Sequence, residues 1–424
     1  MQYTASELAA MLRDARARTL SLVSDLRGEA LLGPKFSIVN PPLWEIGHVA
    51  WFQERWTLRH LAARESLRRD ADALYDSIEV AHDTRWDLLL PTLDETLAYM
   101  QGVLDAVLER LEARPLDPET EYFHLLVLYH EDMHDEAFTY TRQTHGYPRP
   151  PIEGGTASGP GGPLPGDVEF PGGTFELGAG RELPFVFDNE KWAHPVELRP
   201  FRLARAPVTQ TEFAAFVDDA GYRRPELWTE PGWRWREDAG AEHPVYWIPR
   251  DGSWWRRHYD AEVPLEPHRP VLHVNAHEAE AYCRWAGRRL PTEEEWEYAA
   301  CFGAPNGKPR FPWGEQDPTP GFARLDGLSL DCAPVDACPA GDSAQGCRQL
   351  TGNVWEWTAT PFGPFPGFVV DPYKDYSEPW FGDHRVLRGG CLVTRARLLR
   401  NTWRNFYTPD RRDVFAGFRT AAIE

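Results

Sequence analysis

YHEDMHDEAFTYTRQ, residues 129–143, is the stretch that decides the fold of the first part of this chain. His130 and His134 are four residues apart, so they project from one face of a helix on consecutive turns. The other residues on this face are apolar: Phe123, Leu126, Val127, Ala137 and Phe138. We therefore expect a helix whose two imidazoles point into a bundle interior, where buried polar groups need partners.

A third histidine, His48, lies in NPPLWEIGHVAWFQERW, residues 40–56. It shares an apolar stripe with Trp44, Trp51 and Phe52. Three neutral imidazoles that meet in a bundle form a facial ligand set with open positions for water, oxygen or substrate. Imidazole suits zinc, copper, iron and nickel alike, so the residues alone leave the metal open.

The string HEDMH also matches the HExxH motif of zinc hydrolases, in which Glu131 would be the general base. A zinc hydrolase is therefore an alternative interpretation. HxxxH spacing is also common in helices that bind no metal. We expect Glu131 to lie on the solvated flank of the helix rather than at a catalytic centre.

The N-terminal part of the chain is predicted to be a four-helix bundle, residues 1–145, whose metal or ligand sites face inward. Amphipathic periodicity and start signals such as Asn40-Pro41-Pro42 support four helices. Their approximate bounds are residues 4–32, 40–64, 92–113 and 117–143.

Proline and glycine dominate the segment after the bundle, which predicts a linker at 146–168. The remainder, 169–424, shows short strand-like runs at 173–177 and 196–203. Two helices are predicted in it, at about 209–220 and 275–286. The fold class is therefore α+β, with a helical bundle followed by a loop-rich domain.

Composition excludes several classes of function. The chain has 45 Lys and Arg against 65 Asp and Glu, a net charge of −20, which disfavours a nucleic-acid surface. No apolar stretch is long enough to span a membrane, so we expect a soluble cytoplasmic protein. The 6 cysteines lack CxxC pairing, which favours reduced thiols over disulfides or a zinc finger.

Three strings of the second domain combine glycine, tryptophan and carboxylates: RRLPTEEEWE at 288–297, GNVWEW at 352–357 and RGG at 388–390. We interpret them as tight turns that order a domain with little regular structure. The tail RNFYTPDRRDVFAGFR, 404–419, suits a zwitterionic or cationic ligand, although the same residues could cap the fold.

Together these strings resemble the ergothioneine-type sulfoxide synthases over nearly the whole chain. The second-domain motifs are GGTFELG at 172–178, LPTEEEWEYAA at 290–300, GNVWEWT at 352–358, VLRGG at 386–390 and AGFRTA at 416–421. In this family a DinB-like bundle precedes a domain like the formylglycine-generating enzyme and C-type lectins, which completes the substrate site. The resemblance implies Fe(II) held by His48, His130 and His134, with O2 as co-substrate and hercynine (trimethylhistidine) as substrate.

Departures from the family pattern fall at substrate-contacting positions. Leu43-Trp44-Glu45-Ile46-Gly47 stands where ergothioneine enzymes carry Lys-Trp-His-Leu, and Met133 replaces the usual glutamine. Asn405-Phe406-Tyr407 stands where one branch has a Trp-Asp pair. The chain is most similar to the selenoneine synthase branch, which implies C–Se bond formation between hercynine and a selenosugar. The alternative is C–S bond formation with γ-glutamylcysteine or cysteine.

The resemblance also implies roles for individual side chains. Tyr373, Tyr376 or Tyr407 would supply a late proton or electron. The substrate-binding set is Arg85, Met133, Asn405, Phe406, Tyr407 and Asp410. Copper-dependent formylglycine chemistry is disfavoured, because Cys391 is the only cysteine after the RGG turn; we expect it to be a buried structural thiol. A binding module without catalysis and a zinc-dependent thiol transferase are further alternatives.

Overall fold

The computed structural model describes residues 3–113, 115–152, 154–155, 159–183, 185–304 and 307–423. The chain folds into two compact units, Met1–Ile152 and Glu153–Glu424. The first unit is helical and the second combines short helices with small sheets. These features confirm the predicted α+β class.

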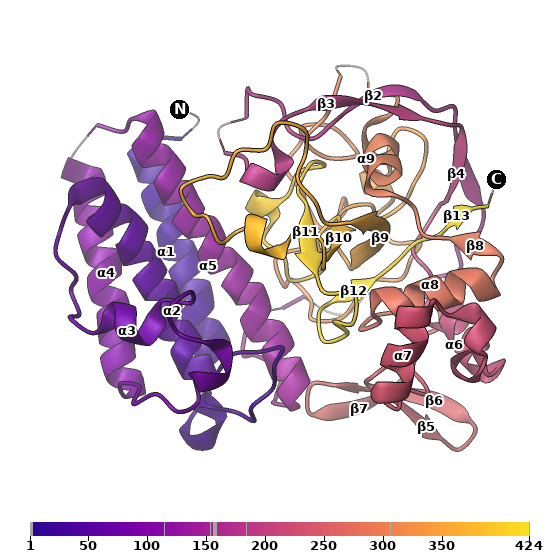
Figure 1. The fold of residues 1–424 in the computed structure, drawn as a ribbon, viewed down its shortest axis with the longest axis horizontal. Coiled ribbons are helices and arrows are strands. Elements are labelled where there is room, and N and C mark those ends of the chain that lie inside the picture. The colour runs from indigo at the N-terminus through magenta and orange to yellow at the C-terminus, as the bar shows by residue number, and fades with distance from the viewer. Residues whose placement is uncertain are drawn as a thin grey trace. The chain divides into compact units, whose positions relative to one another are not determined.

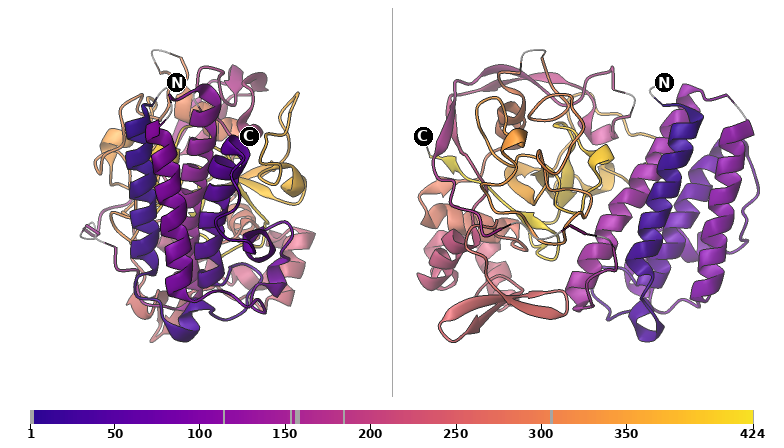
Figure 2. Two further views of the ribbon diagram at one scale, coloured as in Figure 1. Left: turned by 90° about the vertical axis from the view of Figure 1, so that its left-hand side faces the viewer. Right: turned by 180° about the vertical axis from the view of Figure 1, so that it is seen from behind.

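In the described part of the first unit, four long helices form the bundle: α1 (Ala5–Val23), α2 (Pro42–Gln53), α4 (Leu93–Ala113) and α5 (Pro118–His145). Helix α1 packs against α4 and α5, and α2 packs against the same two helices. The four run side by side, as Figure 1 and the left view of Figure 2 show. The predicted four-helix bundle is thus confirmed, and its core lies among these helices.

Both ends of helix α5 carry the residues that typically cap a helix. The Asp117 side chain accepts a hydrogen bond of 2.7 Å from the Thr120 N–H, and Pro118 occupies the first turn. Gly146 ends the helix in the left-handed conformation, with φ of 68°. The helix therefore carries 28 residues, long enough to hold both histidines in its interior.

The bundle differs from the prediction at the ends of its first two helices. Helix α1 ends at Val23 rather than near residue 32, and a separate 3-10 turn, Gly28–Leu31, follows it and begins with a glycine in the left-handed region. Helix α2 continues as a π-helical segment, Glu54–His60. A short helix that the sequence did not predict, α3 (Ala71–Tyr75), packs against α2.

The predicted linker, 146–168, is shared between the units. Tyr147 and Ile152 pack against an apolar cluster of the bundle. Gly162 donates a hydrogen bond of 2.8 Å to Asp336 of the second unit, and strand β1 begins at Asp167. Glu153 and 156–158, which also belong to the predicted linker, lie outside the described residues.

Among the residues that the structure describes, the second unit contains four small sheets, with strand orders β1-β4-β13-β8, β11-β10-β9-β12, β2-β3 and β5-β6-β7. Short helices pack around them (Figure 1). The strands are β1 (Asp167–Phe170), β2 (Gly173–Leu177), β3 (His194–Leu198), β4 (Phe201–Ala204), β5 (Trp247–Arg250), β6 (Ser253–His258), β7 (Ala261–Pro264), β8 (Arg288–Arg289), β9 (Trp355–Pro361), β10 (Arg385–Arg388), β11 (Asn405–Tyr407), β12 (Ala416–Gly417) and β13 (Ala421–Ala422). The helices are α6 (Gln210–Asp218), α7 (Glu230–Asp238), α8 (Ala276–Trp285) and α9 (Glu293–Cys301).

Helices α6 and α8 lie where they were predicted, but two details of the prediction were wrong. The run at 196–203 is two strands, β3 and β4, separated by Arg199 and Pro200. The RRLPTEEEWE string holds helix α9 rather than only tight turns. Thr292 caps this helix in a reciprocal capping box with Glu295, which explains why three glutamates stand in its first turn.

The motif strings of the second unit meet as buried ion pairs. Arg419 of AGFRTA binds both oxygens of Glu356 of GNVWEWT, with two hydrogen bonds of 2.6 Å. Trp296 of helix α9 donates to the same carboxylate at 2.9 Å. Arg404 pairs with Glu293, and Arg388 pairs with Glu297. These motifs therefore hold distant segments together in the interior.

All 6 cysteines are buried, Cys391 among them, and no disulfide joins any described pair. No helix of the described ranges is both long and apolar enough to cross a membrane.

Acid is expected to destabilise the second unit through His273. Burial, aided by the nearby Arg256 and His258, lowers the pKa of His273 to about 3. Below the unfolded-state pKa of about 6.5, the unfolded chain takes up a proton that the folded chain cannot. The free energy of unfolding therefore falls by about 1.4 kcal/mol for each pH unit. This contribution to stability is complete above about pH 6.5 and is lost progressively down to about pH 3.

The measurement is urea unfolding of metal-free protein between about pH 7 and pH 5, compared with the His273→Asn variant. Asparagine tolerates the left-handed backbone at this position, where φ is 62°. The variant should lose stability more gradually than the wild type as the pH falls. Equal slopes of stability against pH for the wild type and the variant would show that His273 takes up its proton as readily in the folded chain as in the unfolded chain.

Candidate metal centre

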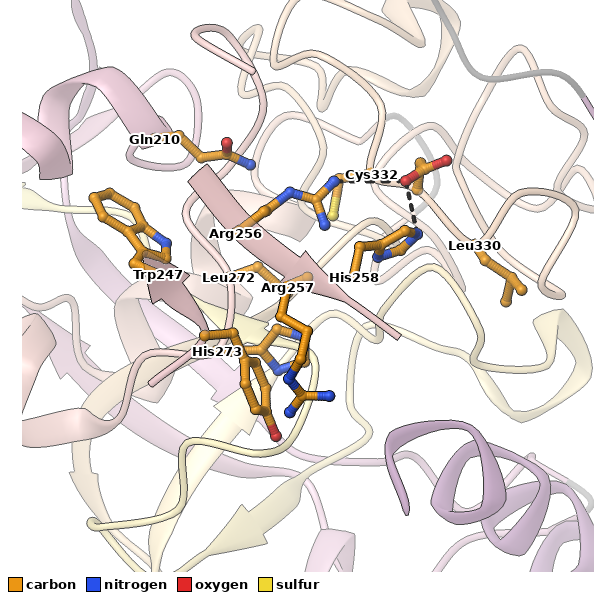
Figure 3. Close-up of a pocket in the computed structure, with 11 residues that line it drawn as sticks. Gln210, Trp247, Arg256, Arg257, His258, Leu272, His273, Leu330 and Cys332 are labelled. Atoms are coloured by element: carbon orange, nitrogen blue, oxygen red, sulfur yellow. Dashed lines mark ion pairs between the residues drawn. The ribbon is translucent and has the colours of Figure 1, made fainter. Parts of the chain in front are cut away.

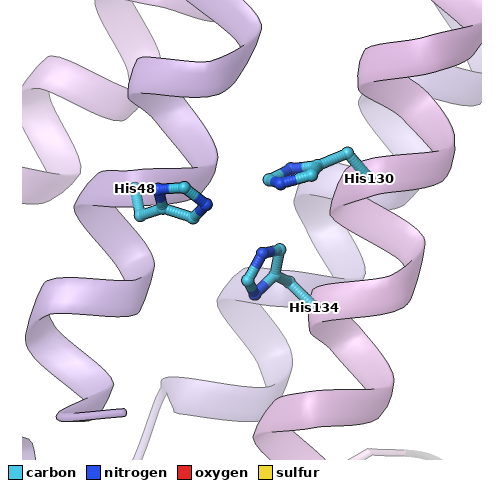
Figure 4. Close-up of side chains that lie close together, drawn as sticks. All are labelled: His48, His130 and His134. Carbon is cyan, nitrogen blue, oxygen red and sulfur yellow. The ribbon is translucent and has the colours of Figure 1, made fainter. Parts of the chain in front are cut away.

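Three histidines meet inside the bundle. His48 comes from α2, whereas His130 and His134 come from consecutive turns of α5, and Figure 4 shows the three rings converging. One nitrogen of each ring lies within 4.8 Å of the corresponding nitrogens of the others. Nitrogens bound to a single metal at about 2.1 Å lie roughly 3–3.5 Å apart, so a small inward adjustment would bring all three onto one ion.

Hydrogen bonds set the orientation of two of these rings. His48 Nδ1 lies 2.8 Å from the Tyr75 carbonyl oxygen, and His134 Nδ1 lies 2.5 Å from Glu45 Oε1. Both acceptors require a proton on Nδ1, so the Nε2 lone pair of each ring remains for a metal. Gly47 permits this arrangement, because a Cβ at this position would overlap the Tyr75 ring.

Burial keeps the imidazoles of His48 and His130 neutral. His48 is 3% exposed and His130 is 4% exposed, and burial is the main cause that lowers the pKa of each well below its usual value. The neighbouring His134 lowers both pKa values further. Neutral imidazole is the form that binds metals, so these two side chains are ready to coordinate near neutral pH.

Aromatic rings hold two of the histidines in place from the side. Phe52 stacks on His130 with ring centroids 3.6 Å apart, and Trp44 stacks on His48 at 4.8 Å. The side chain of His134 is 18% exposed, more than the other two. A ligand would therefore approach the cluster from the His134 side.

The expectation that Glu131 lies on a solvated flank was wrong. Its side chain is 1% exposed, and Arg16 of α1 binds it with an N–O distance of 2.8 Å. Thr19 also donates to this carboxylate at 3.0 Å. Helix α5 packs against α1 as well as α2, and Glu131 lies on the side that α1 covers. A carboxylate held by an arginine is a poor general base, which disfavours the HExxH hydrolase interpretation.

Arg85, predicted to contact the donor, is buried against the bundle near the cluster. Its guanidinium lies 3.9 Å from the centroid of the Trp44 ring. Its nitrogens donate to the side chain of Asn40 and to the carbonyls of Ser77 and Val80. Burial lowers the pKa of Arg85 to about 10, which still leaves it cationic at neutral pH. In this conformation Arg85 stabilises the loop before α4.

The predicted tail residues lie in the second unit. Asn405, Phe406 and Tyr407 form strand β11, which pairs with β10, and all three are half-buried. Phe406 stacks on Phe362 at a centroid distance of 4.0 Å. Asp410 is exposed in the turn after the strand.

The three candidate tyrosines differ in their surroundings. Tyr373 and Tyr376 are neighbours, with ring centroids 6.1 Å apart, and Tyr376 also contacts Phe406. Trp403 donates a 3.4 Å hydrogen bond to the Tyr376 hydroxyl, and burial raises the pKa of Tyr376. Tyr407 lies under the guanidinium of Arg411. The structure thus brings Tyr373, Tyr376 and Phe406 together within the second unit.

Three features of the bundle site were predicted incompletely or not at all. Met133 is half-buried between the paired histidines, as its place in the helix requires. Glu45 was identified only as a departure from the family pattern, although its position three residues before His48 places both on one face of α2. The Tyr75 carbonyl could not be predicted, because a backbone acceptor leaves no signal in the sequence.

A small cavity in the second unit does not have the size of a substrate site. Its volume is about 20 Å³ and its lining includes Arg256, Arg257 and His258 (Figure 3). Arg256 and His258 both form ion pairs with Asp331. A space of this size holds about one water molecule, so we regard this cluster as structural.

Comparison with known proteins places both units in recognised families. Residues 11–138 match the DinB superfamily, and residues 156–423 match the sulfatase-modifying factor enzyme 1-like domain. The hercynine oxygenase of Mycolicibacterium thermoresistibile is 41% identical over 98% of this chain and 94% of its own length. That of Mycobacterium tuberculosis is 39% identical over 98% of both chains.

A formylglycine-generating enzyme of Streptomyces coelicolor is 34% identical but covers only 60% of this chain and 88% of its own. The two hercynine oxygenases, in contrast, match along both units. Their similarity confirms the family that the sequence motifs suggested, and the chain belongs to the hercynine oxygenase family, the ergothioneine-type enzymes in which a DinB-type bundle precedes a sulfatase-modifying-factor-like domain.

Proposed function

We propose that this protein is an iron- and oxygen-dependent enzyme that forms a bond from a chalcogen to the imidazole carbon of hercynine. The observation that carries the proposal is the cluster of three imidazoles, two of them with Nδ1 engaged, in a chain related to hercynine oxygenases over 98% of its length. Neutral imidazoles with open positions opposite them fit iron. Bound iron would supply the redox chemistry with oxygen that organic groups alone lack.

We favour sulfur as the chalcogen, so that the product is a sulfoxide. The relatives are named as hercynine oxygenases, which supports an ergothioneine-type reaction over the C–Se reaction that the sequence motifs suggested. The reaction joins hercynine to γ-glutamylcysteine or cysteine. The imidazole C–H and the thiol S–H are lost, O2 accepts four electrons, one oxygen atom remains on sulfur and the other leaves as water.

A selenosugar donor is the second candidate, and the environment of Arg85 favours it. The guanidinium donates to the protein and lies over Trp44, so in this conformation it is not directed at the carboxylates of a γ-glutamylcysteine. A sugar donor carries no carboxylates and does not need that arginine. Met133, in place of the family's usual glutamine, also alters the surface between the paired histidines.

We further propose that residues of the second unit contribute to the reaction, as the family resemblance implies. Asn405, Phe406, Tyr407 and Asp410 would contact hercynine, whose trimethylammonium group suits aromatic rings and a carboxylate. Tyr373, Tyr376 or Tyr407 would supply a proton. Separate Tyr→Phe replacements test this role, because the tyrosine that delivers the proton should lower kcat with little change in KM.

To test the proposed function, iron-loaded protein is mixed in air with hercynine and with one of three donors: γ-glutamylcysteine, cysteine or a selenosugar. Products are identified by mass spectrometry. We expect an adduct with a thiol donor whose mass is the sum of the two substrates plus one oxygen atom minus two hydrogens. An adduct only with the selenosugar would replace the sulfur assignment by the second candidate, and no adduct with any donor would overturn the proposal.

A further inference from the structure

Glu45 connects the two helices that carry the histidine cluster. It lies on α2, three residues before His48 and on the same face. Its side chain reaches across to α5, where Oε1 lies 2.5 Å from Nδ1 of His134. Only 1% of the residue is exposed, so water does not weaken this contact.

The acceptor at His134 differs in charge from the acceptor at His48. His48 Nδ1 faces a backbone carbonyl, which is neutral, whereas His134 Nδ1 faces a carboxylate. A carboxylate that accepts from one imidazole nitrogen fixes the tautomer and increases the basicity of the other nitrogen. Nε2 of His134 therefore becomes the stronger donor of the two toward a metal.

The Glu45 carboxylate is only partly satisfied by hydrogen bonds. Among the described residues Oε2 is buried and has no hydrogen-bond partner. The nearby Arg85 forms no ion pair with it in the described structure; the guanidinium donates to Asn40, Ser77 and Val80 instead. Arg85 attracts the Glu45 carboxylate through its charge without donating a hydrogen bond to it. A buried carboxylate oxygen that accepts no hydrogen bond is costly, and a further positive charge close to it would stabilise it.

We propose that Glu45 is a positioning residue for the metal centre: it orients His134 and supplies the charge that increases the affinity of the cluster for a divalent cation. A dication on Nε2 of His134 would compensate the buried charge through the imidazole. This inference rests on the proposed function only in that a metal occupies the three histidines. It assigns a role to the residue at which this chain departs from the Lys-Trp-His-Leu pattern.

The test measures Co²⁺ binding to the full-length, metal-free protein. Cobalt reports both its dissociation constant and, through its visible absorption bands, the geometry of its ligands. Glu45→Gln preserves the shape of the side chain but removes the charge, and we expect binding about 10–100-fold weaker, with altered bands. Glu45→Asp retains the charge but shortens the reach to His134 and should also weaken binding.

Glu131→Gln is the matched control. Glu131 is equally buried and adjacent to the ligand His130, but its carboxylate pairs with Arg16 rather than with a ligand. This change should lower the unfolding temperature of the protein while leaving the cobalt dissociation constant and spectrum close to those of the wild type. The contrast separates loss of a buried charge from loss of metal positioning.

The outcomes distinguish this inference from the function on which it rests. Wild-type affinity and an unchanged spectrum in both Glu45→Gln and Glu45→Asp would overturn the role of Glu45 and leave the metal centre intact. Failure of the wild-type protein to bind Co²⁺, Fe²⁺ or Zn²⁺ would overturn the metal centre itself. If Glu45→Gln does not fold, Glu45→Asp is used alone, because it keeps the buried charge. Weaker cobalt binding by this variant then supports the positioning role, and wild-type binding overturns it.

Discussion

Replacing His48 by alanine is expected to abolish tight metal binding and, with it, product formation. His48 is the ligand that α2 contributes, so its loss leaves only the pair on α5. We expect a loss in metal affinity of more than about 100-fold. Replacing a residue that only hydrogen-bonds to a metal ligand already lowers the affinity by about 10–100-fold. Metal content after dialysis and the rate of adduct formation measure the two effects.

His60→Gln provides the control for this replacement. His60 lies in the π-helical segment that continues α2, but it is exposed and contacts Trp56 and Phe123 rather than the cluster. The control should bind one metal ion for each chain with wild-type affinity. If His48→Ala also retains its metal at wild-type affinity, the three histidines are not the binding site.

Replacing Arg419 by alanine should give the largest loss of stability in the second unit, about 3–5 kcal/mol, because it leaves a buried carboxylate without its partner. Arg419 is fully buried and holds both oxygens of Glu356. The pair connects the last motif of the chain to strand β9. Urea unfolding followed by tryptophan fluorescence measures the effect, since many tryptophans lie in this unit.

Two further variants identify the cause of that loss. Replacing both partners, Arg419→Met with Glu356→Leu, should recover much of the lost stability, because no charge remains buried. Arg234→Ala removes an exposed pair with Glu230 and should change the free energy of unfolding by less than about 1 kcal/mol. A loss for Arg419→Ala as small as that for Arg234→Ala would contradict the structural role of the motifs.

The bundle was predictable because its signals are local. Caps and periodicity gave α4 and α5 to within a few residues, since Thr92 and Asp117 both begin a helix in the expected way. The end of α1 was wrong because amphipathic residues continue beyond Val23, whereas the chain leaves the helix there and forms a separate 3-10 turn at Gly28–Leu31. Helix α3 is too short to show a periodic pattern.

The metal site was predictable in part. Helical spacing predicted that His130 and His134 face inward, and the apolar stripe of the second helix predicted the same for His48. Family resemblance added only iron as the expected metal. The position of Glu131 was wrong because the apolar face of α5 indicates one buried side, whereas Arg16 and Thr19 of α1 bury the opposite side with polar contacts. Such contacts depend on the packing of α1 against α5.

The second unit was least predictable because its order comes from long-range ion pairs rather than from periodicity. Arg404 and Glu293 are 111 residues apart, and Arg388 and Glu297 are 91 residues apart. No window of sequence reveals such pairs. Helix α9 was misinterpreted for a related reason: its tryptophan and carboxylates were read as part of a tight turn, yet Glu293 and Glu297 lie on a helix and are buried with their arginines.

The measurement that tests the central claim most directly follows oxygen consumption and adduct formation together. Iron-loaded protein with hercynine and a thiol donor should consume one O2 for each adduct. Protein loaded with zinc, or iron-loaded protein without oxygen, should form none. Adduct formation at an equal rate with zinc in the absence of oxygen would contradict an iron- and oxygen-dependent reaction at His48, His130 and His134.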